Sequence, residues 1–200
     1  MTGIQAAPVR RRSSRRTVIC EAVFDLLGEF GYDQTSMDAV AARAHVSKAT
    51  IYRSWHTKPD LVIDALTHRF GSTPPVPDTG TLRGDLLMVA GVGCQLAGSA
   101  DGAVVAGLMS AAAHNPELSG ALHRCTYQMK HALFETIIAR AVARGEAPVG
   151  ASADTLHEVF HAMVLTRMVL AAAPLDETFV VHVVDDVLLP VLRKEPVVDP

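Results

Sequence analysis

The chain has 200 residues, of which 49% are apolar and 20% charged, with a formal net charge of −3 at pH 7. This composition is typical of a soluble globular protein. The apolar stretch Leu86–Ala113 is interrupted by Gln95, Ser99 and Asp101. No uninterrupted run of about 18 apolar residues exists, so we expect no membrane span.

The cysteines are odd in number and widely spaced, at Cys20, Cys94 and Cys125. This spacing argues against a disulfide scaffold and favours a reducing compartment. The N-terminal arginines are not followed by an apolar run, so we expect no signal peptide and a cytoplasmic protein.

The charge is unevenly distributed. Residues 1–70 contain ten Lys and Arg against seven Asp and Glu, a net charge of +3, whereas residues 71–200 contain eight against fourteen, a net charge of −6. A basic front and an acidic body indicate that only the front meets a polyanion.

Short helices are predicted in the front third of the chain. Residues 1–12 lack any periodicity and are either a mobile basic arm or a solvated tail. From Ser13 to Phe30 apolar residues recur at helical spacing, and Gly31 follows as a left-handed end. A cap at Thr35–Ser36 precedes a short helix to Ala44, Ser47 caps a helix over 48–54, and Thr57 caps a helix to about residue 70.

The remainder is also predicted to be helical. Prolines in 71–80 indicate a linker. Helices are expected over about 81–99, 102–114, 116–144, 152–172 and 175–192, with a loop at 145–151. The predicted fold is all-α with about nine helices, divided into the arm (1–12), a helix-turn-helix domain (13–70) and a helical body (81–195).

Three short helices with a tight turn before the third are what a helix-turn-helix DNA reader requires, because a short, braced helix must enter a groove about 12 Å wide. The predicted third helix carries Lys48, Thr50, Tyr52 and Arg53. Thr50 is small enough to approach a base edge, while Lys48 and Arg53 can reach phosphates or guanine.

The stretch Thr35–Leu66 resembles the DNA-binding domain of the TetR family of bacterial regulators. Val46–Tyr52 reads VSKATIY, followed by an aromatic at Trp55, then Lys58 and Leu61; the family pattern is GVSKGTIYxxFxxKxxL. Two residues depart from that pattern: His45 stands where Gly is usual, and Trp55 replaces Phe. A positive φ in the turn is tolerated better by His than by a β-branched residue.

The resemblance covers about residues 13–66 closely, and the last part, Ala171–Leu192, is similar to the dimerisation region of one TetR subgroup. It implies a homodimeric repressor of double-stranded DNA that binds a palindromic operator and is released by a small-molecule effector, with no cofactor and no catalysis. It places Val46, Ile51 and Trp55 in the core. The DNA contacts that it implies are Thr35, Ser36, Ser47, Lys48, Ala49, Thr50, Tyr52, Arg53, His56 and Lys58.

The body contains a competing motif. His157, Glu158 and His161 match the H-E-x-x-H pattern of zinc proteases, in which two imidazoles one turn apart bind a metal. Catalysis also requires a third ligand and an open coordination position. Glu177 could be nominated, but the helix is apolar on most faces and no strand is predicted to hold a substrate. We therefore expect these histidines to be structural and no metal to be bound; a helical metal-binding protein or zinc hydrolase is the alternative.

Candidate effector-binding residues are apolar, aromatic or polar side chains in the small-residue helices of the body. They are Met88, Cys94, Met109, His114, Tyr127, Met129 and Phe134. The two last helices are predicted to form a four-helix dimer seam through Val159, Met163, Arg167, Val180, Val184, Val187 and Val191. Arg167 is expected to form an ion pair with Asp185 or Asp186. Effector binding would shift the fourth helix, which links the body to the reader.

Overall fold

The computed structural model describes residues 14–71, 75–171 and 173–193, with the side chains of all these except 126–131, 171 and 193. The predicted basic arm at 1–12 lies outside the described residues. No strand occurs in the described ranges, and the all-α prediction is confirmed. The helices are α1 (Arg15–Gln34), α2 (Met37–Arg43), α3 (Lys48–Ser54), α4 (Lys58–Phe70), α5 (Leu82–Ala97), α6 (Ala100–Ala112), α7 (Pro116–Ala143), α8 (Ala153–Thr166), α9 (Glu177–His182) and α10 (Leu189–Arg193).

The last two predicted helices are each longer than one α-helical segment. A π-helical turn over Arg167–Ala171 continues α8, and a second over Val183–Leu188 joins α9 to α10. The stretch predicted as one helix over 175–192 therefore contains α9, a π segment and α10, which is why ten helices are labelled where about nine were expected.

Helix starts in the front third follow local capping chemistry. The hydroxyls of Ser36, Ser47 and Thr57 accept hydrogen bonds from the backbone N–H groups three residues on. Each satisfies a donor that the first turn leaves unpaired. Thr57 also forms a capping box with Asp60. These three predicted caps are confirmed.

The end of α1 differs from the prediction. Gly31 has φ 75°, as a left-handed end requires, but the helix resumes after this kink and runs to Gln34. Phe30 was predicted on the buried stripe and is 50% exposed, whereas Tyr32 beyond the kink is buried. The kink turns the chain, so the buried position passes from Phe30 to Tyr32.

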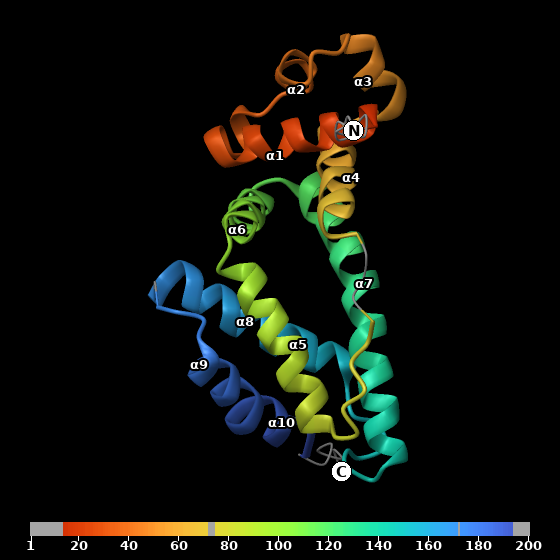
Figure 1. Ribbon diagram of the computed structural model, residues 1–200, viewed down its shortest axis with the longest axis vertical. Coiled ribbons are helices and arrows are strands. Elements are labelled where there is room, and N and C mark those ends of the chain that lie inside the picture. Colours follow the sequence, from red (N-terminus) through yellow and green to blue (C-terminus); the bar gives the residue numbers. More distant parts are fainter. Residues whose placement is uncertain (1–13, 72–74, 172, 194–200) are drawn as a thin grey trace, which may run out of the picture.

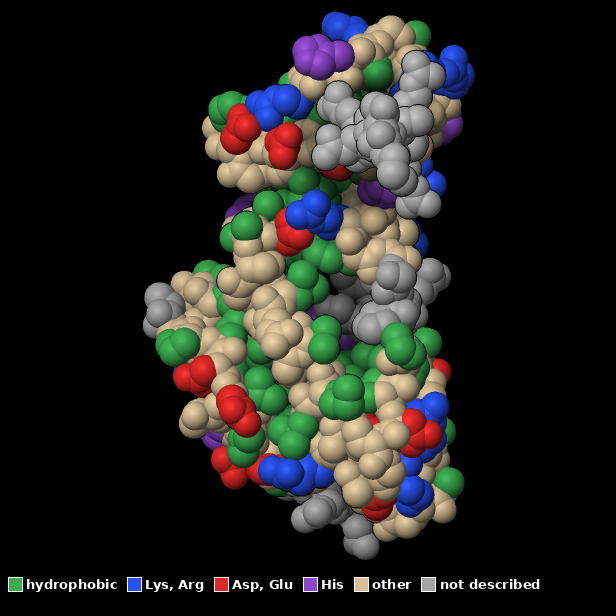
Figure 2. All heavy atoms as spheres, in the orientation of Figure 1, with side chains coloured by type: hydrophobic (Ala, Val, Ile, Leu, Met, Phe, Trp, Pro, Cys, Tyr) green, Lys and Arg blue, Asp and Glu red, His purple; other side chains and the backbone are tan. Residues whose placement is uncertain are grey.

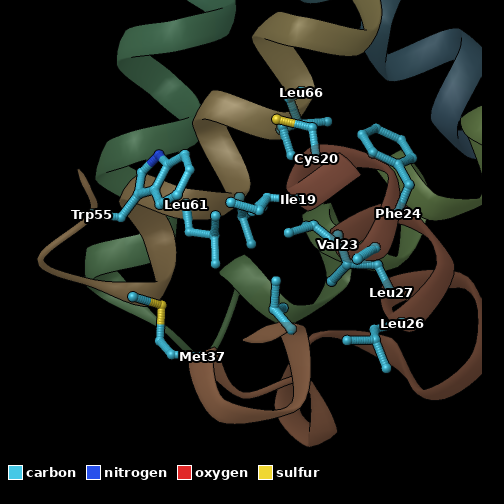
Figure 3. Packing of buried hydrophobic residues seen from close by; sticks show 14 of the residues in the cluster. Ile19, Cys20, Val23, Phe24, Leu26, Leu27, Met37, Trp55, Leu61 and Leu66 are labelled. Atoms are coloured by element: carbon cyan, nitrogen blue, oxygen red, sulfur yellow. The ribbon is translucent and has the colours of Figure 1, made fainter. Parts of the chain in front are cut away.

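Two hydrophobic clusters divide the protein. The first joins α1–α4 with Leu108 of α6 and with Leu118 and Leu122 of α7; Figure 3 shows its centre, where Ile19, Val23 and Leu61 converge. The second cluster joins α5, the later part of α7, α8, α9, the following π segment and α10. α6 and the start of α7 therefore pack directly against α1–α4.

The helix-turn-helix domain formed by α1–α4, called the reader below, lies at one end of an elongated molecule (Figure 1). α2 and α3 lie at that end, α1 runs across below them, and α4 descends towards the long α7. None of the described helices alone has the length and apolar character to cross a membrane. α5 and α6 together reach that composition, but the chain bends by 84° between them.

Candidate nucleic-acid interface

The turn between α2 and α3 adopts the backbone that the sequence required. His45 has φ 53° and is the one non-glycine residue with positive φ in the described ranges. A lone His in the left-handed region is tolerated better than a β-branched residue. The N–H of Val46 donates to Ala41 O at 3.0 Å, which closes the turn. The short helices are therefore joined as a helix-turn-helix reader.

One face of α3 is buried and the other is exposed. Ile51 and Trp55 lie in the core, as predicted. On the outer face, Lys48, Ala49 and Arg53 are exposed, and Tyr52 is 50% exposed. Lys and Arg side chains are visible at this end of the molecule in Figure 2. The exposed face therefore combines cations, an aromatic hydroxyl and a small side chain.

Lys48 is tied to the helix before it. Its Nζ donates to Asp38 Oδ2 of α2 at 2.6 Å. This hydrogen bond raises the pKa of Lys48 above its ordinary value, so the side chain stays positively charged. Asp38 thus orients the cation at the start of α3 while leaving it exposed to solvent.

Two of the predicted phosphate contacts are engaged inside the domain. Thr35 is 2% exposed, and its Oγ1 donates to Gly31 O at 2.8 Å. Lys58 Nζ donates to Tyr32 O at 2.9 Å and lies 3.9 Å from the centre of the Tyr32 ring. Burial lowers the pKa of the Lys58 ammonium. Both side chains hold the end of α1 against the helix-turn-helix domain; Thr35 is buried, whereas Lys58 stays partly exposed.

The other predicted DNA contacts are more accessible. Ser36, Ser47 and His56 are exposed, and Thr50 is half-buried beside Ser47, with 2.9 Å between their hydroxyl oxygens. The structure therefore collects Ser36, Ser47, Lys48, Ala49, Thr50, Tyr52, Arg53 and His56 at the end of the molecule that α2 and α3 form.

Asp64 of α4 braces the reader, a role that the sequence analysis missed. Its Oδ2 accepts from Arg16 Nε of α1 at 2.9 Å and from Trp55 Nε1 at 3.2 Å, and its Oδ1 pairs with Arg16 Nη2. Phenylalanine, the residue usual in the family pattern, has no N–H to donate. The indole at position 55 was the available signal, because a buried Trp generally finds an acceptor.

The predicted effector-binding residues differ in exposure. Met88 is 54% exposed on α5 and His114 is exposed, whereas Cys94 and Phe134 are buried in the second core. Met109 is half-buried on α6. Tyr127 and Met129 have side chains outside the described set. None of the described members lines the cavity between α1 and α6.

A cavity of about 600 Å³, which was not predicted, lies where α1 meets α6. Phe24, Leu27 and Val104 line its apolar part, and Arg69 and Asp101 lie at its border. The Arg69 Nε and Nη2 donate to Asp101 at 2.7 and 3.0 Å, which ties the last turn of α4 to the first turn of α6.

The predicted dimer residues fall into two groups. Val180 and Val184 are buried within the single chain, where α9 and its π segment pack on α5. Their assignment to a subunit interface is therefore wrong. Val159, Met163, Arg167, Val187 and Val191 are partly exposed. Leu170, which was not predicted, is 80% exposed.

The expected ion pair of Arg167 is also wrong. Arg167 Nε donates to Pro174 O at 2.8 Å, and its guanidinium lies 4.4 Å from the centre of the Phe179 ring. Asp185 binds Arg83 instead, and Asp186 binds His182. The guanidinium of Arg167 therefore interacts with a backbone carbonyl and an aromatic ring, and not with the carboxylate that was expected.

The HEVFH histidines lie on one face of α8. The ring centres of His157 and His161 are 4.2 Å apart, and His161 Nδ1 is 2.9 Å from His157 O. Glu158 is exposed. Within the described ranges, no group of three or more His, Cys, Asp or Glu side chains is placed to hold a metal ion.

The helix-turn-helix reader and the all-helical body define a DNA-binding regulator. Residues 19–65 match the sequence model described as bacterial regulatory proteins, tetR family, and residues 76–187 match that of the tetracyclin repressor-like C-terminal domain. The chain belongs to the TetR family of transcriptional regulators, which is not a family of enzymes.

Individual relatives agree with this assignment. A DNA-binding transcriptional repressor TetR of Mycobacteroides abscessus is 38% identical over 186 residues, 92% of this chain and 97% of the relative. The crystal structure of the TetR family regulator SCO0332 has a TM-score of 0.70 at 26% identity, covering 90% of this chain and 99% of the other. The regulator FadR of Bacillus subtilis, solved with stearoyl-CoA, shares the fold with a TM-score of 0.68 at 19% identity, covering 84% and 96%.

Proposed function

We propose that this regulator acts in the cytoplasm as a homodimeric repressor that binds a palindromic operator and is released by a small molecule bound in its body. The observation that carries the proposal is the exposed cationic face of α3, with Lys48, Tyr52 and Arg53 outward and Ile51 and Trp55 inward. Such a helix can enter the major groove while its buried face keeps it rigidly placed.

Apolar surface on α8 supports dimer formation. Val159, Met163 and Leu170 recur at helical spacing along α8 and its π-helical extension, with Arg167 between them, and Leu170 is 80% exposed. Val159 and Met163 also pack partly on the second core, and the exposed end of this stripe is a candidate subunit contact. A symmetric pair through this stripe would present two copies of α3 to two half-sites about 34–36 Å apart.

Contacts between α4 and α6 support a release mechanism. The Arg69–Asp101 ion pair joins these helices, and the Arg69 guanidinium lies 5.5 Å from the centre of the Phe24 ring of α1. A small molecule that displaces α6 would therefore move α4 and α1, and with them the reader. Release requires the small molecule to bind more tightly to the protein conformation that does not bind DNA than to the one that does.

DNA binding is tested with duplexes selected from random-sequence DNA by the purified protein. Lys48→Ala together with Tyr52→Ala is expected to abolish selective retention while circular dichroism shows an intact fold. The matched control is Arg83→Ala, which removes a cation from the start of α5 in the body. Wild-type affinity should fall steeply as salt rises, because phosphate contacts release counterions. Equal retention of the double variant and the wild type would overturn the assignment of α3.

Dimer formation has a separate test. Sedimentation at micromolar concentration should give the mass of two chains, and Leu170→Asp should shift it towards one chain. A wild-type protein that sediments as one chain would overturn the homodimer, whereas an unshifted Leu170→Asp variant would remove the α8 stripe from the interface.

A further inference from the structure

A second cationic surface lies beside the recognition helix. A groove of about 360 Å³ separates the first turns of α1 from the later half of α3. Figure 1 shows the first turns of α1 close below α3. The groove is lined by Arg15, Arg16, Ile19, Thr50, Arg53, Ser54, Trp55 and Asp64. None of the residues that α1 contributes was among the predicted DNA contacts.

Three arginines and one carboxylate line this groove, and their pairing decides its charge. Asp64 binds Arg16 through both carboxylate oxygens and also accepts from the Trp55 indole. Among the described residues, no carboxylate lies within ion-pair distance of Arg15 or Arg53. Asp64 therefore neutralises Arg16. Arg15 and Arg53, on opposite sides of the groove, remain without a compensating carboxylate.

The start of α1 adds hydrogen-bond donors to this charge. Ser14 caps the helix by accepting from the N–H of Thr17 at 3.2 Å. The backbone N–H groups of Arg15 and Arg16 lie in the first turn of α1, so no carbonyl of the helix is available to accept from them. The same end carries the positive pole of the helix dipole, which favours an anion. Thr50 and Ser54 supply hydroxyls from the opposite wall.

We propose that this groove binds a phosphate of the DNA backbone, held between Arg15 of α1 and Arg53 of α3. This inference rests on the proposed DNA binding and adds to it a contact outside the recognition helix. Phosphate contacts fix the register of a reader on the duplex without reading sequence. With α3 in the major groove, α1 reaches the strand at the groove edge, and Asp64 of α4 holds the neighbouring Arg16 and Trp55 in place.

The test is the salt dependence of binding by Arg15→Gln. Affinity is measured by fluorescence anisotropy from about 0.05 to 0.2 M salt, the range in which phosphate contacts dominate. One probe is the selected operator and the other an unrelated duplex of equal length. Loss of one phosphate contact per subunit should reduce the slope of log K against log salt by about 1.8 for a dimer. Both duplexes should lose affinity by a similar factor, on the order of tenfold or more.

Controls separate this contact from general effects. Arg83→Gln makes the same charge change at the start of α5 and should leave the slope unaltered. If Arg15 and Arg53 bind one phosphate, the slope lost by Arg15→Gln combined with Arg53→Gln should be smaller than the sum of the single losses. Circular dichroism and the emission of Trp55, the sole tryptophan of the sequence, verify the fold of each variant.

Each outcome bears on one proposal. If the wild type binds neither duplex, the proposed function fails. If the wild type binds and Arg15→Gln matches it in affinity and slope, only the phosphate groove fails. Loss of affinity for the operator alone would also overturn the groove, because a contact with the backbone must weaken both duplexes.

Discussion

Gly102 allows the chain to turn from α5 into α6, and replacing it with alanine should be costly. A Cβ at this position would lie 2.3 Å from Ala97 O and 2.4 Å from Leu96 O. Both atoms belong to the backbone at the end of α5, where the chain bends by 84°. Relief of the clash therefore requires a change in the bend, and not the rotation of a side chain.

The magnitude follows from two opposing effects. Overpacking typically costs about 1–3 kcal/mol, and a backbone clash belongs at the upper end. Alanine favours a helix over glycine by about 1 kcal/mol. We expect Gly102→Ala to lower the free energy of unfolding by about 2 kcal/mol. Gly107 of the same helix has no atom within 4 Å of an added Cβ, so Gly107→Ala should raise stability by about 0.5–1 kcal/mol.

Urea unfolding followed by circular dichroism at one fixed protein concentration measures both variants. The same chemical change in one helix should thus give shifts of opposite sign in the urea midpoint. A Gly102→Ala protein as stable as the wild type would show that no backbone clash occurs at this bend, and a Gly107→Ala protein destabilised to the same extent would contradict the assigned difference between the two positions. Gly102→Ala should also weaken operator binding, because a shift of α6 would disturb the ion pair between Asp101 of α6 and Arg69 of α4.

Three further predictions concern single contacts. Trp55→Phe should lower the free energy of unfolding by about 1–2 kcal/mol, although Phe is usual in the family pattern, because the bond to the Asp64 carboxylate is lost; no change in urea unfolding would show that this bond contributes nothing. Burial raises the pKa of Cys20 to about 11 from 9.0, so the folded state retains a proton that the unfolded state loses. Stability should fall between pH 9.0 and about 11 more steeply in the wild type than in Cys20→Ala, and equal slopes would contradict this. Arg69→Ala should weaken operator binding at least fivefold, yet change stability by about 1 kcal/mol or less because the pair with Asp101 is half exposed; unchanged affinity would remove this pair from the release mechanism.

The reader was predictable because its determinants are local. Ser36 and Ser47 cap helices through backbone groups three residues away. The apolar spacing around Ile51 assigns one face of α3 to the core, which leaves Lys48 and Arg53 outside. Interactions within a turn or two depend on spacing alone, so periodicity and capping were sufficient to place them.

Contacts between helices were not predictable in the same way. Lys58 has the residue type of a phosphate contact, yet it binds the Tyr32 carbonyl because α4 starts beside the end of α1. Asp64 carries no motif, and it becomes a brace only when α1 and α3 converge on it. The chemistry of each side chain was readable, but its partner depends on elements that lie far apart in the sequence.

Hydrogen bonding and periodicity act over a few residues, so the helices, their caps and the outward-facing residues of α3 follow from the local sequence. Which apolar stripe faces which neighbour depends on the packing of helices that lie far apart in the chain. Val184, predicted at the subunit seam, is buried where its π segment packs on α5 of the same chain, whereas Leu170, which was not predicted at the seam, is 80% exposed. The hydrophobic effect is non-directional, so an apolar stripe indicates only that burial is favourable. The packing of helices distant in the sequence determines which element covers it.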